Sequence, residues 1–415
     1  MKFVFFLIGS SILMFGGCAK KNQTPTAPVP TSIDTIHYVI KPQRDILWPS
    51  LAQTAWPKPL HDAQCTGRSL FNGPLQGRVK RTIPLSEFTT DPVMGPDSVF
   101  YIVSDTNLYA ITLSGTRLWS AYLGDLSHSS VMANDNPAFI GADGVIYVGN
   151  YNGILAFRND GSLLWHAQLN DVVLLKSCAI GLDGSIYAIA RSGTLYAIDQ
   201  SGNILWQRNA PVGQFRGSPD ATVTFAPDGK RFYVGGSTAQ QSLYVVNTNG
   251  DILRIDSLGS GQYGAISVDI DGNVFSFFAG DLVSISSSGV FRWRIAGTGA
   301  NWNVTVDPDG NIAYLSRGSL ISVDNAGQKR WSLPVHQADY ITHLVCDAQG
   351  TIYVETSDDL LNCDVQAISN TGTVRWTLSV GACVKEAGPS LTREGYLLFP
   401  HSNYSPGPKQ MYVIE

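Results

Sequence analysis

The side chains that could act as acids, bases or nucleophiles are scattered along the chain. Five of the seven histidines are spread over the predicted repeats: His128, His166, His336, His343 and His401. A lone histidine in a β-protein is more often a hydrogen-bonded structural group than a ligand. The adjacent carboxylates Asp358 and Asp359 stand in a polar stretch that favours two solvated groups over an acid–base pair. No G-x-S-x-G, H-E-x-x-H or P-loop pattern occurs.

These groups are carried by a β-rich unit, which is clearest at LDGSIYAIARSGTLYAIDQSGNILW, residues 182–206. Two short segments, 186–190 and 194–198, are rich in β-branched and aromatic residues and predict strands. Glycine-containing turns flank them, and a third strand begins near Asn203. One such unit cannot cover its own apolar faces, so we expect copies of it to pack together.

The unit repeats with a small residue, then Gly five positions later, then Trp four positions after that. Six copies fit the full pattern and end at Trp119, Trp165, Trp206, Trp293, Trp331 and Trp376. A seventh copy, Val245, Gly250 and Arg254, keeps the spacing with Arg in place of Trp. Large buried aromatic side chains at these positions predict a structural girdle.

The turn before each hairpin provides a second count. It occurs eight times: Asp97-Ser98, Asp143-Gly144, Asp183-Gly184, Asp228-Gly229, Asp271-Gly272, Asp309-Gly310, Gln349-Gly350 and Glu394-Gly395. The repeat length of roughly 38–48 residues is typical of a four-stranded propeller blade. The last copy, 394–415, stops after its third strand, whereas Gly77 and Arg81 keep the Gly-to-Trp spacing near the other end.

We therefore predict an all-β fold, an eight-bladed β-propeller of four-stranded antiparallel blades over residues 77–415. A strand at about 79–85 is expected to complete the last blade and close the ring. Closure would remove sheet edges that invite aggregation.

A ring of polar and aromatic residues is predicted on one face, at the loops that enter the innermost strands. The candidate binding residues are Lys176, Arg216, Tyr263, Asn301, Trp302, His343, Lys385 and Glu386. Loops on a rigid ring are a frequent place for recognition. The alternative is a water-filled funnel with polar walls; Tyr263 and Trp302 are the strongest candidates for contact with a ligand.

Five cysteines follow Cys18, so at least one must stay free. By predicted blade position Cys363 and Cys383 lie on the same face and could form a disulfide. Cys178 and Cys346 fall on predicted innermost strands, which favours small buried thiols. No C-x-x-C spacing occurs, and we expect no metal site.

The N-terminus has the organisation of a lipoprotein export signal. Residues 1–17 combine a positive Lys2 with an apolar core, and Cys18 follows Gly16-Gly17. This arrangement resembles the bacterial lipobox, in which the cysteine is lipidated; an ordinary cleaved signal is the alternative. Residues 18–32 form a Pro- and Thr-rich tether. Ala19 favours the outer membrane by resemblance to the usual sorting rule.

Residues 33–76 read as an irregular arm packed on the ring, since X-Pro pairs exclude long helices and tryptophans favour burial. The net charge is −5 over 415 residues, and Lys and Arg are dispersed, so nucleic acid is not an expected partner. We expect a monomer.

The segments YAIDQSGNILW, LAFRNDGSLLW and QAISNTGTVRW resemble the repeats of pyrroloquinoline-quinone-type β-propellers, over roughly residues 77–415. That group includes quinoprotein dehydrogenases and the non-enzymatic propeller lipoprotein of the outer-membrane protein assembly machinery. The resemblance implies that the repeated Trp packs against the neighbouring blade. It is specific for fold and weak for function.

The dehydrogenases of this group hold their quinone with adjacent disulfide-bonded cysteines, a calcium site and a catalytic Asp. This chain has no adjacent cysteines and no acidic cluster with calcium-loop spacing. We therefore expect no cofactor and no enzyme activity. The leading hypothesis is a membrane-anchored scaffold that binds a protein in the bacterial envelope. The alternatives are a propeller that binds a small molecule, sugar or peptide in its funnel, and an enzyme with a non-standard site.

Overall fold

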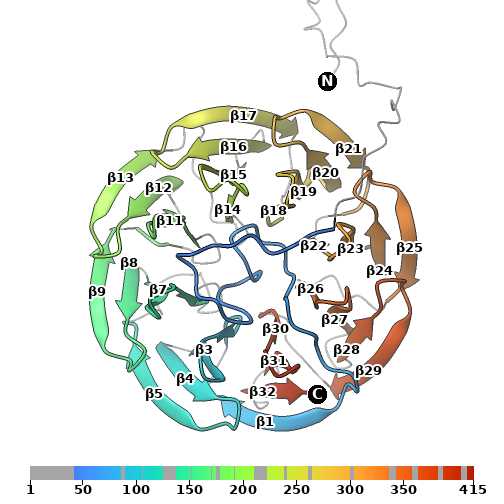
Figure 1. Cartoon of the computed structure of the whole chain (residues 1–415), viewed down its shortest axis with the longest axis horizontal. Helices are drawn as coiled ribbons and strands as arrows, with labels where there is room; N and C mark the ends of the chain where they lie inside the picture. The colour runs from blue at the N-terminus through green and yellow to red at the C-terminus, as the bar shows by residue number, and fades with distance from the viewer. Residues whose placement is uncertain are drawn as a thin grey trace, which may run out of the picture. The chain divides into compact units, whose positions relative to one another are not determined.

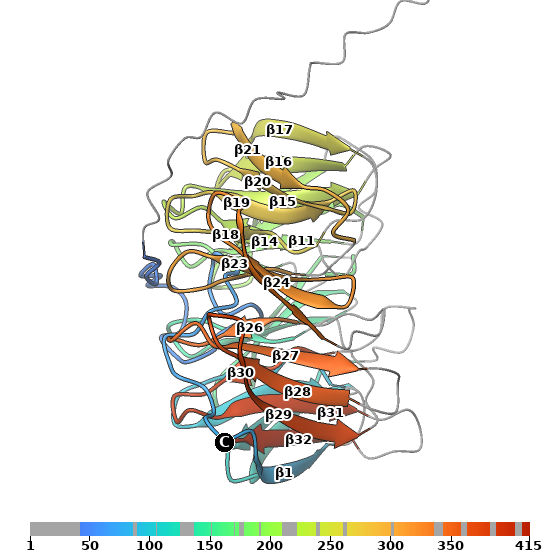
Figure 2. The same cartoon turned by 90° about the vertical axis from the view of Figure 1, so that its right-hand side faces the viewer.

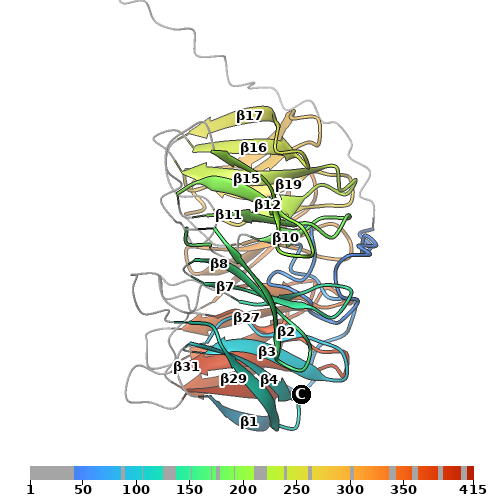
Figure 3. The ribbon, with the colours of Figure 1, turned by 90° about the vertical axis from the view of Figure 1, so that its left-hand side faces the viewer.

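Eight four-stranded antiparallel sheets stand around a central axis in the computed structural model of the chain (Figure 1). Each sheet forms one blade, with a short strand at the axis and a long strand at the circumference. The predicted all-β, eight-bladed propeller is confirmed. Side views show that the blades form a thick disc and that residues 42–78 lie against one of its two faces (Figures 2 and 3).

The structure describes residues 42–85, 89–104, 106–124, 137–150, 152–169, 171–173, 178–190, 192–209, 222–237, 241–259, 264–299, 303–335, 343–357, 363–381, 387–402 and 409–415. Within these ranges no helix is long and apolar enough to cross a membrane.

Blades 1 to 4 follow chain order from the axis outward. Blade 1 contains β2 (Val93–Met94), β3 (Val99–Ser104), β4 (Asn107–Thr112) and β5 (Arg117–Tyr122). Blade 2 contains β6 (Phe139–Ile140), β7 (Ile146–Asn150), β8 (Gly153–Phe157) and β9 (Leu163–Gln168). Blade 3 contains β10 (Ala179–Ile180), β11 (Ile186–Ile189), β12 (Thr194–Ile198) and β13 (Ile204–Asn209). Blade 4 contains β14 (Val223–Phe225), β15 (Arg231–Ser237), β16 (Gln241–Asn247) and β17 (Ile252–Gly259).

Blades 5 to 7 repeat this order. Blade 5 contains β18 (Ser267–Val268), β19 (Val274–Phe278), β20 (Asp281–Ile285) and β21 (Phe291–Ile295). Blade 6 contains β22 (Thr305–Val306), β23 (Ile312–Ser316), β24 (Ser319–Val323) and β25 (Lys329–Pro334). Blade 7 contains β26 (Val345–Cys346), β27 (Ile352–Ser357), β28 (Cys363–Ile368) and β29 (Val374–Gly381).

Blade 8 combines strands from both ends of the chain. Its inner strands are β30 (Ser390–Leu391), β31 (Leu397–Ser402) and β32 (Lys409–Ile414). Its outermost strand is β1 (Val79–Leu85), which pairs antiparallel with β32, from Val79 opposite Ile414 to Leu85 opposite Lys409.

Sheet register explains the spacing of the sequence repeat. In blade 3, Ala197 lies opposite Trp206, and a one-residue bulge follows because Ile198 lies opposite Ile204. The same register shift recurs between the two outer strands of every blade. A bulge increases local twist and redirects the side chain beside it. The small residue of the repeat is therefore the one that faces the Trp across the sheet.

Each girdle tryptophan joins its blade to the next one. The indole N–H donates to a backbone carbonyl in the outer turn of the following blade, at 2.8–3.0 Å. The six acceptors, in chain order of the tryptophans, are the carbonyl oxygens of Asn159, Gln200, Thr248, Asn325, Asn370 and Pro74. The indole also covers the turn glycine: a Cβ at Gly202, whose φ is +86°, would lie 2.8 Å from the ring of Trp165.

The arm, residues 42–78, is tied to the axial end of seven blades. Six amides of the innermost strands donate to arm carbonyls at 2.8–3.0 Å: Met94 to Trp56, Ile140 to Pro57, Phe225 to Ala63, Val268 to Gln64, Val306 to Thr66 and Cys346 to Gly67. In blade 3 the indole N–H of Trp48 donates to the Ile180 carbonyl at 2.7 Å. Backbone groups at buried strand ends need such partners, so the arm satisfies the inner strands as a further strand would.

Asp62 fixes the shape of the arm where it crosses the axis. Its carboxylate accepts hydrogen bonds from the amide of Thr66 at 2.9 Å and from the Thr66 hydroxyl at 2.5 Å. Burial raises the pKa of Asp62, but hydrogen bonding and charge from His61 together with the bonds from Thr66 outweigh burial, and the net pKa lies below the ordinary 3.8.

The contact between Trp165 and Gly202 leads to a first testable prediction. Gly202→Ala adds a methyl group against the indole and an L-residue at positive φ. Gly144→Ala at φ +78° adds only the second cost, because no heavy atom lies within 4 Å of its Cβ. We expect Gly202→Ala to lower the free energy of unfolding by about 1–3 kcal/mol more than Gly144→Ala, in urea denaturation. Equal losses would contradict a packing role for this glycine.

Asp62 leads to a second prediction, on pH. Because its folded-state pKa is lowered, ionised Asp62 stabilises the protein above the unfolded-state pKa, and this stabilisation is lost as pH falls through the folded-state pKa. Asp62→Asn should lower stability near pH 7 by about 1–3 kcal/mol and flatten the decline of stability in acid. Urea denaturation from neutral pH down to pH 2 measures both effects, with Asp364→Asn on β28 as the control. An unchanged acid slope would show that Asp62 does not hold the arm.

Candidate functional site

The funnel was predicted at the loops that enter the innermost strands. Of the eight residues proposed for it, the structure describes one, His343. The other seven stay predictions outside the described residues: Lys176, Arg216, Tyr263, Asn301, Trp302, Lys385 and Glu386. The site must therefore be built from His343 and from the described residues at the same level of other blades.

Polar side chains one or two positions before the innermost strands connect neighbouring blades at this level. The Thr222 hydroxyl accepts from the amide of Ile266 at 3.1 Å. The Asn303 side chain exchanges two hydrogen bonds with the backbone of Leu344, at 3.1 and 3.2 Å. These pairs join blade 4 to blade 5 and blade 6 to blade 7, which gives the funnel wall fixed polar groups.

His343 belongs to a three-blade contact. Its Nδ1 lies 3.4 Å from Oδ2 of Asp91, and Oδ1 of Asp91 accepts the amide hydrogen of Gly388 at 2.5 Å. The imidazole of blade 7 reaches blade 1 because Gly388 of blade 8, between them, has no side chain; a Cβ there would overlap the ring. The side chains of Asp91 and His343 are only 4% and 13% exposed.

This geometry limits what the pair can do chemically. The Asp91 carboxylate beside Nδ1 fixes the ring orientation, which leaves Nε2 as the nitrogen able to bind a ligand. The same contact also fixes three blades in place, which is a structural role. Among the described residues, no three His, Cys, Asp or Glu side chains lie close enough to hold a metal ion.

Three hydroxyl groups on the innermost strands of blades 4 to 6 are already used in hydrogen bonds, whereas that of Ser390 on β30 has no partner among the described residues. Ser267 donates to the carbonyl of Cys65 at 2.7 Å, and Thr305 donates to the carbonyl of Thr66 at 3.0 Å. Thr224 donates to Ile266 of the next blade at 2.9 Å. On these three blades a ligand on the axis would therefore meet satisfied groups at the arm end and would have to enter from the opposite face.

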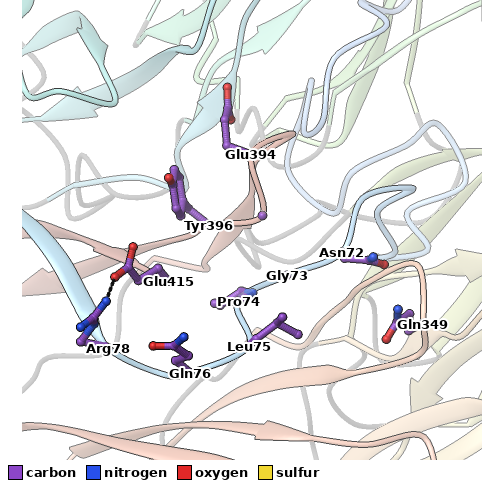
Figure 4. A pocket seen from close by; sticks show the side chains of 11 residues that line it. Asn72, Gly73, Pro74, Leu75, Gln76, Arg78, Gln349, Glu394, Tyr396 and Glu415 are labelled. Atoms are coloured by element: carbon purple, nitrogen blue, oxygen red, sulfur yellow. Dashed lines mark hydrogen bonds and ion pairs between the residues drawn. The ribbon is translucent and has the colours of Figure 1, made fainter.

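A second site, missed by the sequence reasoning, is a cavity of about 490 Å³ on the arm face between blades 7 and 8 (Figure 4). Its wall includes the arm from Asn72 to Gln76, together with Gln349, Tyr396 and Glu415. Leu75 stands at this cavity and is 78% exposed. The cavity exists because the arm and both ends of blade 8 meet there, and neither the arm path nor that meeting has a local sequence motif.

Charged groups along one side of this cavity neutralise one another. Arg78 pairs with Glu415, and Lys80 Nζ donates to Glu415 Oε2 at 2.8 Å and to the Tyr396 hydroxyl at 2.7 Å. Hydrogen bonds from Lys80 and Arg78 lower the pKa of Glu415, and the bonds to Glu415 and Tyr396 raise the pKa of Lys80. The cavity can accept a small polar group, but its described charges already have partners.

The cysteines divide into free and bonded thiols. Cys65, Cys178 and Cys346 are free and buried, as expected for Cys178 and Cys346. Burial, and then the nearby carboxylates of Asp307 and Asp347, raise the pKa of Cys346 well above its ordinary value, so its thiol is unreactive. Cys363 is disulfide-bonded. Its pairing with Cys383 stays a prediction because Cys383 lies outside the described residues, as does Cys18.

Blade geometry, the Trp girdle and the repeat together define a β-propeller of the pyrroloquinoline-quinone-like repeat class. Residues 63–257 and 141–307 match the family of the outer membrane protein assembly factor BamB. The two matches cover residues 63–307, more than half of the chain, and the chain belongs to this family. No curated protein matches the chain.

Solved structures show the same fold at low sequence identity. BamB from Moraxella catarrhalis is 16% identical with a TM-score of 0.58, over 81% of this chain and 99% of that one. A europium-containing methanol dehydrogenase is 13% identical with a TM-score of 0.60, over 87% and 90% of the two chains. The Dos1 propeller is 10% identical with a TM-score of 0.58, over 83% and 95%. A shared fold at such identities does not transfer activity.

The Asp91 contact leads to a third prediction. Asp91→Ala leaves the Gly388 amide and the His343 ring without their buried acceptor, so we expect a loss of about 2–3 kcal/mol in the free energy of unfolding. Glu415→Gln, which weakens the exposed pairs with Arg78 and Lys80, serves as the control. It should cost less than about 1 kcal/mol. Thermal and urea denaturation measure both; similar small losses would remove the structural role assigned to Asp91.

Proposed function

We propose that this chain is a non-enzymatic scaffold of the bacterial cell envelope, anchored to a membrane through Cys18, that binds a protein partner. The observation that carries the proposal is the match of residues 63–307 to the family of the outer membrane protein assembly factor BamB. A role in the assembly of outer membrane proteins follows from that family. The outer membrane is the proposed location, since Ala19 follows the lipobox-like cysteine.

Exposed aliphatic side chains on the circumference support a protein partner. The outermost strands of blades 3 to 5 place Leu205, Leu253 and Phe291 on the surface, each at least half exposed. Ile204 and Ile255 accompany them on β13 and β17. Neighbouring apolar side chains on an exposed surface are typical of protein-binding sites. Such a surface suits a macromolecular partner better than a small polar ligand.

The arm supports the same proposal. Its hydrogen bonds to seven blades, six from its backbone and one from the Trp48 side chain, use the groups at one end of the axis. This leaves the circumference and the opposite face for recognition. The alternative of a small-ligand site in the funnel is favoured by one observation, the Asp91–His343 pair with Nε2 as its remaining polar atom.

The proposal leads to a fourth prediction. Crosslinking of the tagged full-length chain in its native envelope, followed by mass spectrometry, should recover a fixed protein partner with the chain in the membrane fraction. Cys18→Ser, the matched control, should leave the membrane fraction and lose most of that partner, because the lipid anchor is gone.

Two outcomes would contradict the proposal. Recovery of no reproducible partner by the wild-type chain would remove the scaffold role and favour the funnel ligand. Turnover of an alcohol with a dye acceptor, after addition of pyrroloquinoline quinone and calcium to the purified chain, would contradict the non-enzymatic assignment.

A further inference from the structure

Seven of the eight blade-to-blade junctions hold a large side chain tightly over a turn glycine, and one does not. Six hold a tryptophan over a turn glycine. At the junction of blades 4 and 5 the side chain of Arg254 takes this position over Gly289, and its Nε is held by Asp256 at 3.0 Å. At the junction of blades 8 and 1 the turn glycine is Gly115, and the position that corresponds to Trp is Arg81 on β1.

Gly115 is not covered in the same way. The heavy atoms nearest to a Cβ built there are Cγ1 of Ile83 at 3.4 Å and Cδ of Arg81 at 3.8 Å. At four of the tryptophan junctions the indole ring would lie at 2.7–2.8 Å from such a Cβ. Arg81 is exposed and its guanidinium therefore does not replace the indole.

A groove of about 330 Å³ opens beside this glycine, between β1 of blade 8 and β4–β5 of blade 1. We name it the seam groove. Its walls are mainly apolar and include Ile83, Leu85, Tyr109, Ile111, Gly115 and Arg117. The volume is at the lower end of the range for ligand pockets, which suits one large side chain better than a whole cofactor.

The other junctions show which side chain such a groove accepts. In five of them the indole N–H donates to the carbonyl two residues before the turn glycine. The corresponding carbonyl here belongs to Leu113, and none of the hydrogen bonds seen among the described residues ends on it. The seam groove lies between strands of blades 8 and 1 and has the apolar walls of an indole site. The Leu113 carbonyl, two residues before Gly115 in the groove wall, corresponds to the acceptor at the other junctions.

Charge at the groove indicates what accompanies this side chain. Arg81 and Arg117 border it, and neither forms an ion pair with a carboxylate of the described residues; the ion pairs of this strand region are those of Arg78 and Lys80 with Glu415. The Arg117 guanidinium lies 5.6 Å from the centroid of the Tyr109 ring, which leaves its N–H groups able to bind carboxylates. Two cations without a carboxylate partner among the described residues, beside an apolar groove, complement an acidic segment.

We propose that the seam groove binds a tryptophan, or a similar aromatic side chain, from an extended acidic segment of a partner protein. The aromatic ring packs on Gly115 against Tyr109 and Ile83, as the chain's own tryptophans do elsewhere, and carboxylates beside it pair with Arg81 and Arg117. This inference rests on the proposed function as a protein-binding scaffold and assigns it a site and a partner chemistry.

The fifth prediction tests this with peptides and the full-length chain. Acetyl-Asp-Gly-Trp-Gly-Glu-amide should bind at least about 10-fold more tightly in isothermal titration calorimetry than the same peptide with Ala for Trp, since a buried aromatic anchor contributes most of such affinity. Replacement of its two acidic residues by Lys should also weaken binding, and added salt should lower the affinity of the acidic Trp peptide.

Variants separate the groove from the rest of the surface. Arg81→Trp supplies the missing indole from within the chain, so it should abolish peptide binding and raise Tm by about 2 °C. Arg254→Trp, the same change at the other arginine junction, should leave affinity within about twofold of wild type. Tyr109→Ser removes an aromatic wall without adding bulk and should reduce affinity several-fold, which keeps the test valid if Arg81→Trp folds poorly.

Three results would overturn the inference: equal binding of the Trp and Ala peptides, unchanged affinity in both Arg81→Trp and Tyr109→Ser, or a dimer of the free chain that Arg81→Trp dissociates, which would make a second copy the occupant. The pull-down of the Arg81→Trp variant distinguishes the levels of failure. If the Arg81→Trp variant still recovers the partner at wild-type yield, the seam groove is not the binding site, although the scaffold function stands. If the wild-type chain recovers no partner, the scaffold function itself is contradicted.

Discussion

The indole that bridges two blades is the interaction on which the rest of the structure depends. A single four-stranded blade is small, and the apolar side chains on both of its faces would be partly exposed to solvent. The tryptophan at its circumference covers the turn of the next blade, donates its N–H to a carbonyl there and packs against an aromatic residue of its own sheet, such as Tyr187 beside Trp206. Repeated at six junctions, this contact joins the apolar faces of short sheets into shared cores.

The arm imposes the second constraint. Innermost strands of only two or three residues have amides with no neighbour on the axial side, and the arm carbonyls supply acceptors for six of them. A chain segment without regular structure can do this because only its backbone takes part. The two faces of the propeller therefore differ. On one face the axial ends of the innermost strands are hydrogen-bonded to the arm, and on the other face they are not. A partner that binds this ring can thus distinguish one face from the other.

Much of the fold could be predicted from the sequence because it depends on local residue types at fixed spacing. Turn glycines, the small residue opposite Trp and the strand at 79–85 were all placed by spacing alone, and the register explains why that spacing holds. The contact of His343 with Asp91 could not be predicted, because it requires a missing side chain at Gly388 and a partner two blades away. The cavity beside Leu75 depends on the path of the irregular arm, which has no sequence motif. The seam groove depends on how the side chains pack at the one junction where neither Trp nor Arg254 covers the turn glycine.

The pairing of β1 with β32, which are distant in sequence, has a consequence for how the protein folds. The ion pair of Arg78 with Glu415 joins residues 337 positions apart. The paired residues of β1 and β32 are almost as distant in sequence, from Val79 opposite Ile414 to Leu85 opposite Lys409. Such distant pairing makes folding slow, since the entropy of bringing the ends together is lost before the contacts form. During synthesis β1 is made long before β32, so β1 has no partner in its sheet until residues 409–414 have been added.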